Sequence, residues 1–93
     1  MGGITYKKIL YGELFFVQIL LLTVDEKERN NGYGTNLMRY VMSSYNKIAV
    51  YSDYGAISFY QKLGFKANIL LFNEIKDVLS TEINCIFLCY GFD

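Results

Sequence analysis

The sequence predicts an α/β domain with a mixed central sheet organised around a β-α-β unit. First, a long apolar run at residues 14–24 is followed by a polar, glycine-containing loop and then by an amphipathic helical pattern. Second, a short apolar segment at residues 47–51 follows that helix, and a helical crossover joins parallel strands. Third, the strand-like segments near the end of the chain are typical of antiparallel additions to such a core.

Composition limits the class of protein. The 93 residues suit a single domain, 1–93, and a hydrophobic content of 53% supplies a large core for that size. The formal net charge is zero, which predicts neither direct binding of nucleic acid nor binding to an anionic membrane. No apolar run is long enough to span a bilayer, so no membrane partner is expected.

Histidine is absent, and the only two cysteines are Cys85 and Cys89. Catalysis by a bound metal or by a histidine-activated nucleophile is therefore not expected, and we predict no metal site. The two cysteines stand four residues apart in an apolar run, which predicts one face of a strand. Buried, reduced thiols of this kind indicate a nuclear or cytoplasmic protein.

The first half of the predicted sheet is a hairpin. Residues 3–10 have strand composition, and Lys7 and Lys8 favour a position near the sheet edge. Residues 11–13 form the turn. Residues 14–24 are apolar on both faces, which predicts a central strand covered on both sides. Gln18 is the one strongly polar side chain inside this run, and a buried amide paired with neighbouring backbone is one interpretation of it.

The second half alternates helices and strands. Leu37, Met38, Val41, Met42 and Tyr45 form one apolar stripe, which predicts a helix over residues 32–45. A strand at residues 47–51 and a second helix at residues 54–63 follow, and Gly64 ends that helix. We predict two further strands, at residues 65–72 and 83–90.

The loop that opens the first helix has the features of an anion site. Gly32 and Gly34 let the backbone turn sharply and leave its amides uncovered. A helix that starts there directs unpaired N–H groups and its positive dipole end outward, which suits a phosphate or pyrophosphate. No Lys-Ser or Lys-Thr follows the glycines, and Leu37 stands where a dinucleotide fingerprint needs a small residue. The simpler alternative is a polar turn at a glycine-rich helix start.

Two motifs resemble one enzyme family. The pattern [RQ]-x-x-G-x-G at residues 29–34 resembles the acetyl-CoA pyrophosphate loop of the GNAT superfamily of N-acetyltransferases. The pattern A-x-x-F-Y-x-x-x-G-F at residues 56–65 is similar to the second GNAT hallmark, at the expected distance from the first. Taken alone, Phe59 and Tyr60 could be core aromatics.

A closer resemblance covers nearly the whole chain. Gly-Gly-Ile at residues 2–4, Asn-Gly-Tyr-Gly-Thr-Asn-Leu-Met at residues 31–38 and Tyr-Ser-Asp at residues 51–53 are similar to histone acetyltransferases of the general-control/PCAF type. Residues 47–50 and 59–65 also resemble the acetyltransferase domain of the Elongator catalytic subunit. The resemblance implies an acetyl-CoA-dependent lysine N-acetyltransferase whose acceptor, a histone tail, attacks the thioester directly.

The resemblance also implies roles for individual residues. Backbone groups of Leu22, Thr23 and Val24 would bind the pantetheine arm of acetyl-CoA. Ala56 and Phe59 would line that arm, and Tyr60 would protonate the departing thiolate. The residues that would hold the pyrophosphate are Arg29, Asn30, Asn31, Gly32, Tyr33, Gly34 and Thr35.

A first departure from the family pattern, at Gln18, leads to an alternative function. Gln18 occupies the position of the catalytic Glu, and an amide cannot act as a general base near neutral pH. Glu13 lies five residues earlier and on the opposite strand face, so only an intervening β-bulge would make it a reserve base. The alternative is a catalytically impaired acyl-CoA-binding or subunit-interaction module. If Gln18 occupies the base position, Gln18→Glu should raise lysine acetylation.

The second departure concerns the start of the chain. The family's first strand and helices would precede Met1 and are missing from the resemblance. Their absence predicts an exposed edge strand, which leads to instability, a homodimer or a covering subunit.

Overall fold

The computed structural model describes residues 2–24 and 32–92. Its strands and helices follow each other in a β-β-α-β-α-α-β order, with short 3₁₀ turns before α2 and after α3. The elements are β1 (Gly3–Tyr11), β2 (Leu14–Thr23), α1 (Tyr33–Ser44), β3 (Ile48–Ser52), the 3₁₀ turn Tyr54–Ala56, α2 (Ile57–Lys62), α3 (Ile69–Ile75), the 3₁₀ turn Lys76–Val78 and β4 (Ile86–Tyr90).

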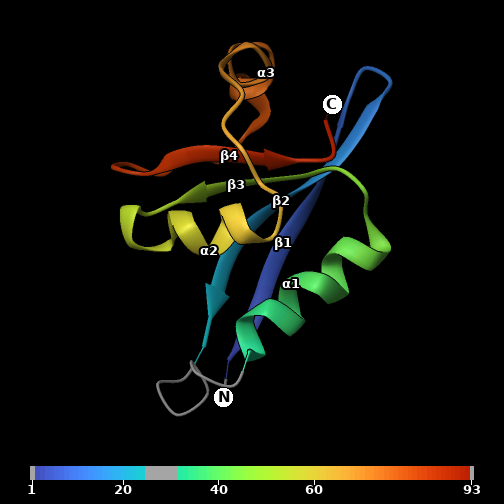
Figure 1. The fold of residues 1–93 in the computed structure, drawn as a ribbon. Helices are drawn as coiled ribbons and strands as arrows, with labels where there is room; N and C mark the ends of the chain where they lie inside the picture. Colours follow the sequence, from blue (N-terminus) through green and yellow to red (C-terminus); the bar gives the residue numbers. More distant parts are fainter. Residues whose placement is uncertain (1, 25–31, 93) are drawn as a thin grey trace.

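The strands form one mixed sheet in the order β1-β2-β3-β4. β1 and β2 make an antiparallel hairpin, β2 and β3 are parallel, and β4 returns antiparallel beside β3. α1 is the crossover between the two parallel strands, as predicted. β1 lies at one edge of the sheet, which is also as predicted (Figure 1).

β2 and β3 separate before either strand ends. Their described pairing covers only three positions and stops at Ile19 opposite Val50, although β2 continues to Thr23 and β3 to Ser52. Figure 1 shows the two arrowheads pointing in different directions. The β1–β2 register jumps here: Thr5 faces Leu21 and the next residue, Tyr6, faces Ile19, which leaves Leu20 as a bulge residue. The bulge bends β2 away from β3 and opens a gap in the sheet.

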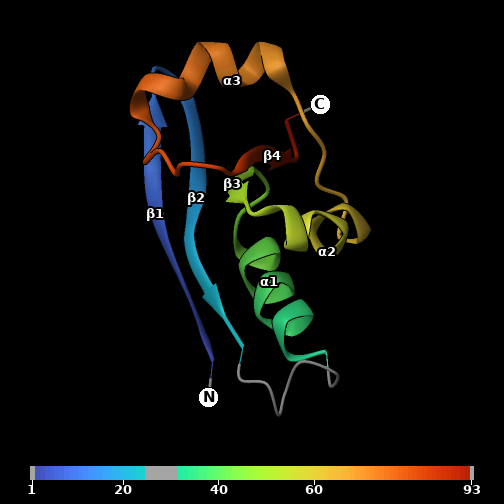
Figure 2. The same cartoon turned by 90° about the vertical axis from the view of Figure 1, so that its left-hand side faces the viewer.

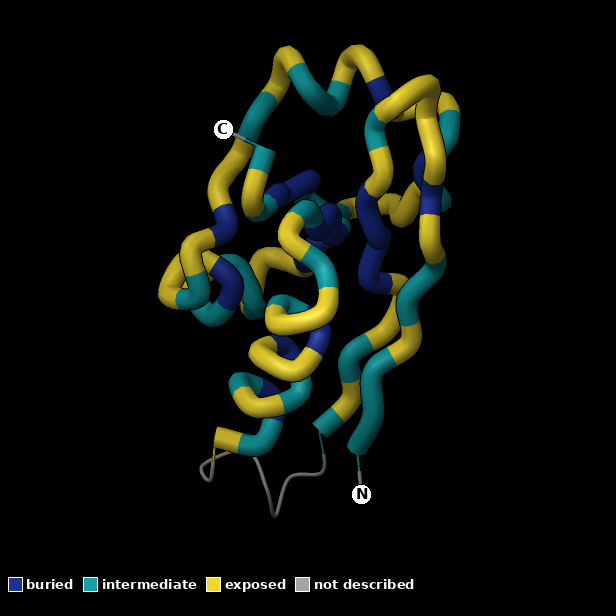
Figure 3. The backbone as a smooth tube through the Cα atoms, turned by 90° about the vertical axis from the view of Figure 1, so that its right-hand side faces the viewer, coloured by how far each residue is buried: buried dark blue, intermediate teal, exposed yellow. Residues whose placement is uncertain are grey.

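Two clusters of buried side chains pack on opposite faces of the sheet. α1 and α2 cover one face and α3 covers the other (Figures 1 and 2). The buried stretches of β2, β3 and β4 run through the middle of the molecule in Figure 3. The α1/α2 cluster contains Val17, Ile19, Met38, Val41, Ile48, Val50, Tyr60, Phe65 and Leu88. The α3 cluster contains Ile9, Phe16, Ala49, Ile75, Leu79, Phe87 and Cys89.

The strand predicted at residues 65–72 is wrong. Only Lys66 makes a single antiparallel bridge, to Cys89, and the chain then turns into α3. The apolar composition of this segment resembles a strand, but the Asn68 side chain accepts a hydrogen bond from the Leu71 N–H at 3.0 Å and caps a helix. The inward residues of α3 also follow the helical period rather than alternation.

The strand predicted at residues 83–90 is shorter in the structure, where β4 begins at Ile86. Asn84 has a positive φ of 62°, and Ile83 is 84% exposed, so this segment turns before pairing starts. Cys85 therefore precedes the strand and is half-buried, whereas Cys89 is buried within it. Neither of these two cysteines forms a disulfide bond. No helix in the described part of the chain is long and apolar enough to cross a membrane.

Candidate active site

The gap between β2 and β3 opens into a groove that adjoins α2. A hollow of about 210 Å³ lies where the strands part, and Tyr60 and Phe59 of α2 border it. A second hollow of about 450 Å³ continues from it towards the start of α1. Leu22, Asp53, Ala56 and Phe59 line both hollows, so the two form one continuous surface, which we call the strand-gap groove. Its lining residues are Ile19, Leu20, Leu21, Leu22, Val24, Gly34, Val50, Tyr51, Ser52, Asp53, Gly55, Ala56, Phe59 and Tyr60.

The edge of β2 that faces the groove is suited to bind an extended chain. The other edge of β2 is paired with β1 as far as Thr23. Beyond Ile19, no described residue of β3 pairs with β2. Backbone amides and carbonyls of a parted strand can pair with an extended ligand in the way that a further strand would.

The start of α1 meets the far end of the groove. Gly32 has φ 73° and ψ 17°, a left-handed conformation that favours glycine, and no side chain caps the helix. The first helical hydrogen bond runs from the Asn36 N–H to the Gly32 carbonyl at 2.9 Å. The N–H groups of Tyr33, Gly34 and Thr35 therefore precede the helical ladder and have no acceptor within it.

Gly34 is favoured by close packing rather than by its dihedral angles. It is buried in the first turn of α1. A Cβ atom at Gly34 would lie 3.2 Å from Val24 Cγ2 and 3.5 Å from Phe59 Cζ. The small residue thus lets the helix start approach two side chains of the groove. The neighbouring Tyr33 points elsewhere, since its hydroxyl donates to the Gly2 carbonyl at 3.3 Å.

Tyr60 brings a buried phenol hydroxyl to the groove. It is 6% exposed, and its ring packs edge-on against Phe59 and Phe65 with centroids 5.1 and 5.5 Å away. Burial, with a smaller contribution from the negative charge of Asp53, raises the pKa of Tyr60 from 10.0 to about 12. Tyr60 therefore holds its proton throughout the neutral range and can act there as a proton donor but not as a base.

Asp53 is a groove residue that sequence reasoning missed as a site residue. It follows β3 directly, and its Oδ1 atom accepts a hydrogen bond from the Ala56 N–H at 2.9 Å. It is the only carboxylate among the described residues that line the groove. The signal was present in the sequence, because a polar residue just after a parallel strand lies at the edge where ligands of α/β sheets bind.

The remaining predicted cofactor residues do not all border the groove. Thr23 is exposed and turns towards β1, where its Oγ1 atom accepts from the Gly3 N–H at 3.2 Å. Only its backbone could serve the predicted role. Arg29, Asn30 and Asn31 lie outside the described residues.

Gln18 is held by backbone. Its side chain is 1% exposed, its Nε2 atom donates to the Ser80 carbonyl at 2.7 Å, and its Oε1 atom accepts from the Ser80 N–H at 2.8 Å. Both polar atoms of the amide are therefore satisfied by one residue of the segment that joins α3 to β4. Glu13 lies in the exposed hairpin turn, and the pairing of residues 14–19 is regular. The bulge follows Gln18, so it does not change the relative orientation of Glu13 and Gln18.

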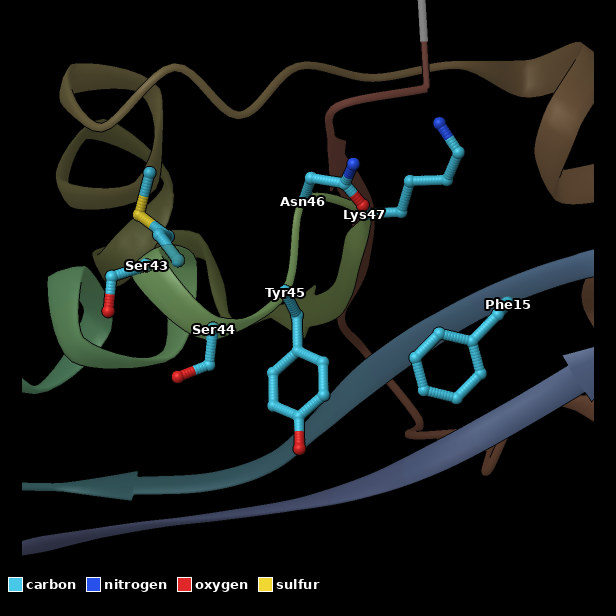
Figure 4. A pocket seen from close by; sticks show the side chains of 7 residues that line it. Phe15, Ser43, Ser44, Tyr45, Asn46 and Lys47 are labelled. Carbon is cyan, nitrogen blue, oxygen red and sulfur yellow. The ribbon is translucent and has the colours of Figure 1, made fainter.

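A separate hollow of about 390 Å³ lies at the opposite end of α1 (Figure 4). Tyr45 and Phe15 approach each other there with ring centroids 6.2 Å apart. The Lys47 ammonium donates to the Gly91 carbonyl at 3.0 Å. None of the predicted site residues lines this hollow. The described residues also contain no group of three or more His, Cys, Asp or Glu side chains that could hold a metal ion.

Comparisons with known proteins agree with this geometry. The family model of the acetyltransferase (GNAT) domain matches residues 2–67. Among solved structures, the Naa50 protein of Arabidopsis thaliana in complex with the bisubstrate analogue CoA-Ac-MVNAL is 25% identical in sequence and superimposes with a TM-score of 0.71. The match covers 98% of this chain and 65% of the Naa50 chain, so the chain spans about two thirds of that structure's length. No curated protein matches the sequence.

Proposed function

This chain belongs to the GNAT acetyltransferase family, and on that premise we propose that it is an acetyl-CoA-dependent N-acetyltransferase of protein amines. The observation that carries the proposal is the strand-gap groove. It joins the first turn of α1, the parted edge of β2 and Tyr60 along one surface. The helix start would bind the pyrophosphate of acetyl-CoA, the parted strand edge would bind the extended pantetheine arm, and Tyr60 would lie beside the thioester.

The residues of the groove fit acetyl-CoA. The uncapped N–H groups at the start of α1 suit the pyrophosphate, as the positive end of the helix dipole does. Leu22 and Val24 border the path of the arm on one side, and Ala56 and Phe59 border it on the other. The small side chain of Ala56 and the absent side chain of Gly34 leave room for a thin chain.

Bound acetyl-CoA supplies an acetyl group that is activated as a thioester. The amine nitrogen of the acceptor, after losing one proton from its ammonium form, attacks the carbonyl carbon, and the carbon–sulfur bond breaks with its electron pair on sulfur. Tyr60 donates its proton to that sulfur and is reprotonated by the second proton that the nitrogen loses. The products are an amide, CoA thiol and one released proton. A buried, protonated Tyr60 is suited to this donor role.

The acceptor and the setting are proposals of finer detail. The motifs shared with general-control/PCAF-type enzymes favour the lysine of a histone tail. The peptide in the analogue bound to Naa50 favours a peptide amine more generally. Thiols that form no disulfide favour a nuclear or cytoplasmic location. A covering subunit or a second copy at β1 is also part of the proposal, because β1 is an edge strand.

A second candidate function is an acyl-CoA-binding or subunit-interaction module without turnover. The observation that favours it is the pairing of Gln18 with Ser80, which leaves no general base at the position of the family's catalytic Glu. If the chain does catalyse transfer, Asp53 is the carboxylate in the groove that could take the ammonium proton in place of that Glu.

Calorimetric titration with acetyl-CoA tests the proposal. Gly34→Asp adds a bulky negative charge at the first turn of α1, and we expect it to weaken binding by about tenfold or more. Asn36→Asp is the matched control, because it adds the same charge to the same turn at an exposed position that does not line the groove. Absence of binding by the folded wild-type chain would refute the proposal.

Mass spectrometry of peptide mixtures incubated with acetyl-CoA then separates the two candidates. Acetylated products that depend on the chain and are lost in Gly34→Asp indicate the enzyme. Binding of acetyl-CoA without any acetylated product indicates the module.

A further inference from the structure

We propose that the hollow beneath α3 is the acceptor subsite, and that it receives an apolar side chain on the same residue that carries the reacting amine. The inference rests on the proposed acetyl transfer, because it names the acceptor of that reaction. It favours peptides with an apolar first residue and a free α-amine over lysine side chains.

The hollow lies between the end of β3, the start of β4 and the first turn of α3, and its volume is about 270 Å³. Its walls are mainly aromatic and aliphatic, with two aromatic contacts of Tyr51, to Phe72 and Phe87, at centroid distances of 6.3 and 6.0 Å. The full lining is Tyr51, Ala67, Asn68, Ile69, Phe72, Cys85, Ile86 and Phe87.

The hollow and the strand-gap groove share one lining residue. Tyr51 lines both cavities. It stands one position beyond Val50, the last residue of β3 that pairs with β2. Tyr51 still pairs with Phe87 of β4 on one side, but on its other side no described residue of β2 pairs with it. Past this open edge, an acceptor in the hollow on the α3 face would approach a thioester held in the gap beside Tyr60, which belongs to the opposite face.

The lining indicates which acceptors fit. None of the described residues that line the hollow carries a formal charge. The carboxamide oxygen of Asn68 is already used by the Leu71 N–H. A basic histone tail would find no carboxylate here, whereas an apolar group would leave water for an apolar wall.

The chemistry of the two amine classes also differs. A lysine ε-amine stands at the end of an unbranched four-carbon stem, so no side chain lies next to it. An α-amine has the side chain of its own residue on the adjacent carbon. Only the α-amine can place its nitrogen in the gap and a side chain in the neighbouring hollow at once.

The test uses the whole chain, acetyl-CoA and a series of pentapeptides derived from MVNAL. We expect kcat/KM with Met, Leu or Phe as first residue to exceed that with Ser or Asp by about tenfold or more. An Nα-acetylated pentapeptide with one central lysine should react no better than the Ser peptide.

Two adjacent substitutions connect that preference to the hollow. Ile69→Asp puts a charge at the rim, whereas Leu70→Asp puts the same charge on the same helix turn outside the lining. Both residues are exposed, at 68% and 80%, and an acidic residue suits the first turn of a helix, so both variants should fold. Ile69→Asp should abolish the preference for apolar first residues, Leu70→Asp should retain it, and the affinity for acetyl-CoA should be unchanged in both.

Thiol labelling gives a readout that does not depend on turnover. Cys85 lines the hollow and is half-buried, while Cys89 is buried. In the presence of CoA, a Met-first pentapeptide should slow alkylation of Cys85 by iodoacetamide, and an Asp-first pentapeptide should not.

Equal rates for all first residues, faster reaction of the lysine peptide, or identical behaviour of Ile69→Asp and Leu70→Asp would each overturn the inference. So would acetyl-CoA binding with no acetylated pentapeptide at all. Failure to bind acetyl-CoA would instead refute the proposed function itself, which keeps the two failures distinct.

Discussion

At the scale of single residues, Gln18 shows how a polar side chain in an apolar strand can be structural. Its amide pairs with both backbone groups of one residue, accepting from the N–H and donating to the carbonyl of Ser80. A carboxylate has the same shape but no donor. The gain of activity expected for Gln18→Glu therefore competes with the loss of this pairing.

We predict that Gln18→Glu destabilises the fold by about 3 kcal/mol at pH 8, because a buried carboxylate would face the Ser80 carbonyl. Burial should raise the pKa of the introduced carboxyl above its ordinary value of about 4.3. The protonated form can donate, so the stability deficit relative to wild type should shrink at pH 4 and grow as the pH rises. Urea denaturation at both pH values measures it, and a pH-independent deficit would contradict the pairing.

Tyr60 allows a second prediction, from its pKa of about 12. Below pH 10 the hydroxyl is protonated in both the folded and the unfolded chain. Between pH 10 and 12 the unfolded chain loses the proton while the folded chain keeps it, so about 2–3 kcal/mol of folding free energy is lost across this window. Tyr60→Phe should remove that part of the alkaline loss. Tyr54→Phe, at a position that is 68% exposed, is the control, and equal pH profiles of the two variants would argue against the shift.

At the scale of elements, α3 is the segment where composition and structure disagree. Its run of apolar residues resembles a strand, but its inner residues pack on the sheet at helical spacing. Its start is fixed by the side chain of Asn68. Because α3 forms one wall of the proposed acceptor subsite, that cap is a feature of the site as well as of the fold.

We predict that Asn68→Ala lowers the free energy of unfolding by about 1 kcal/mol, since the Leu71 N–H would lose its acceptor. Asn68→Asp should retain the stability, because Asp caps helices equally well. Urea denaturation of the two variants beside wild type checks this prediction. A loss of the same size in Asn68→Asp would show that the side chain stabilises the fold in some other way.

At the scale of the whole molecule, the open edge of the sheet stands out. β1 pairs with β2 on one side only in the described sheet. Leu10 and Phe15 are paired residues of the hairpin and are 70% and 45% exposed. An edge strand beside exposed apolar side chains is a surface for another strand or another subunit.

We expect the chain to self-associate through this hairpin as its concentration rises. Leu10→Lys should shift the association to higher concentration by about tenfold, because it places a charge in the apolar patch. Ile83→Lys, an equally apolar and 84% exposed position outside the hairpin, should leave the association unchanged. Sedimentation velocity over a concentration series measures both, and a wild-type chain that stays monomeric throughout would contradict the expectation.

Local sequence patterns determined the β-α-β core, the hairpin and the order of the first elements. These features follow from apolar periodicity and from glycines placed at turns and at a helix start. Both signals act within a few residues. The same locality identified part of the groove, since Gly34, Ala56 and Phe59 belong to two short motifs and Leu22 and Val24 to the apolar run before them.

Only the tertiary structure decided the rest. The helix at residues 69–75 required a sheet face to pack against, which composition does not reveal. The partner of Gln18 lies 62 residues away in the sequence. The gap between β2 and β3 depends on a bulge and on where two distant strands stop pairing. Such features come from contacts between segments that are remote along the chain, so neither spacing nor residue type specifies them in advance.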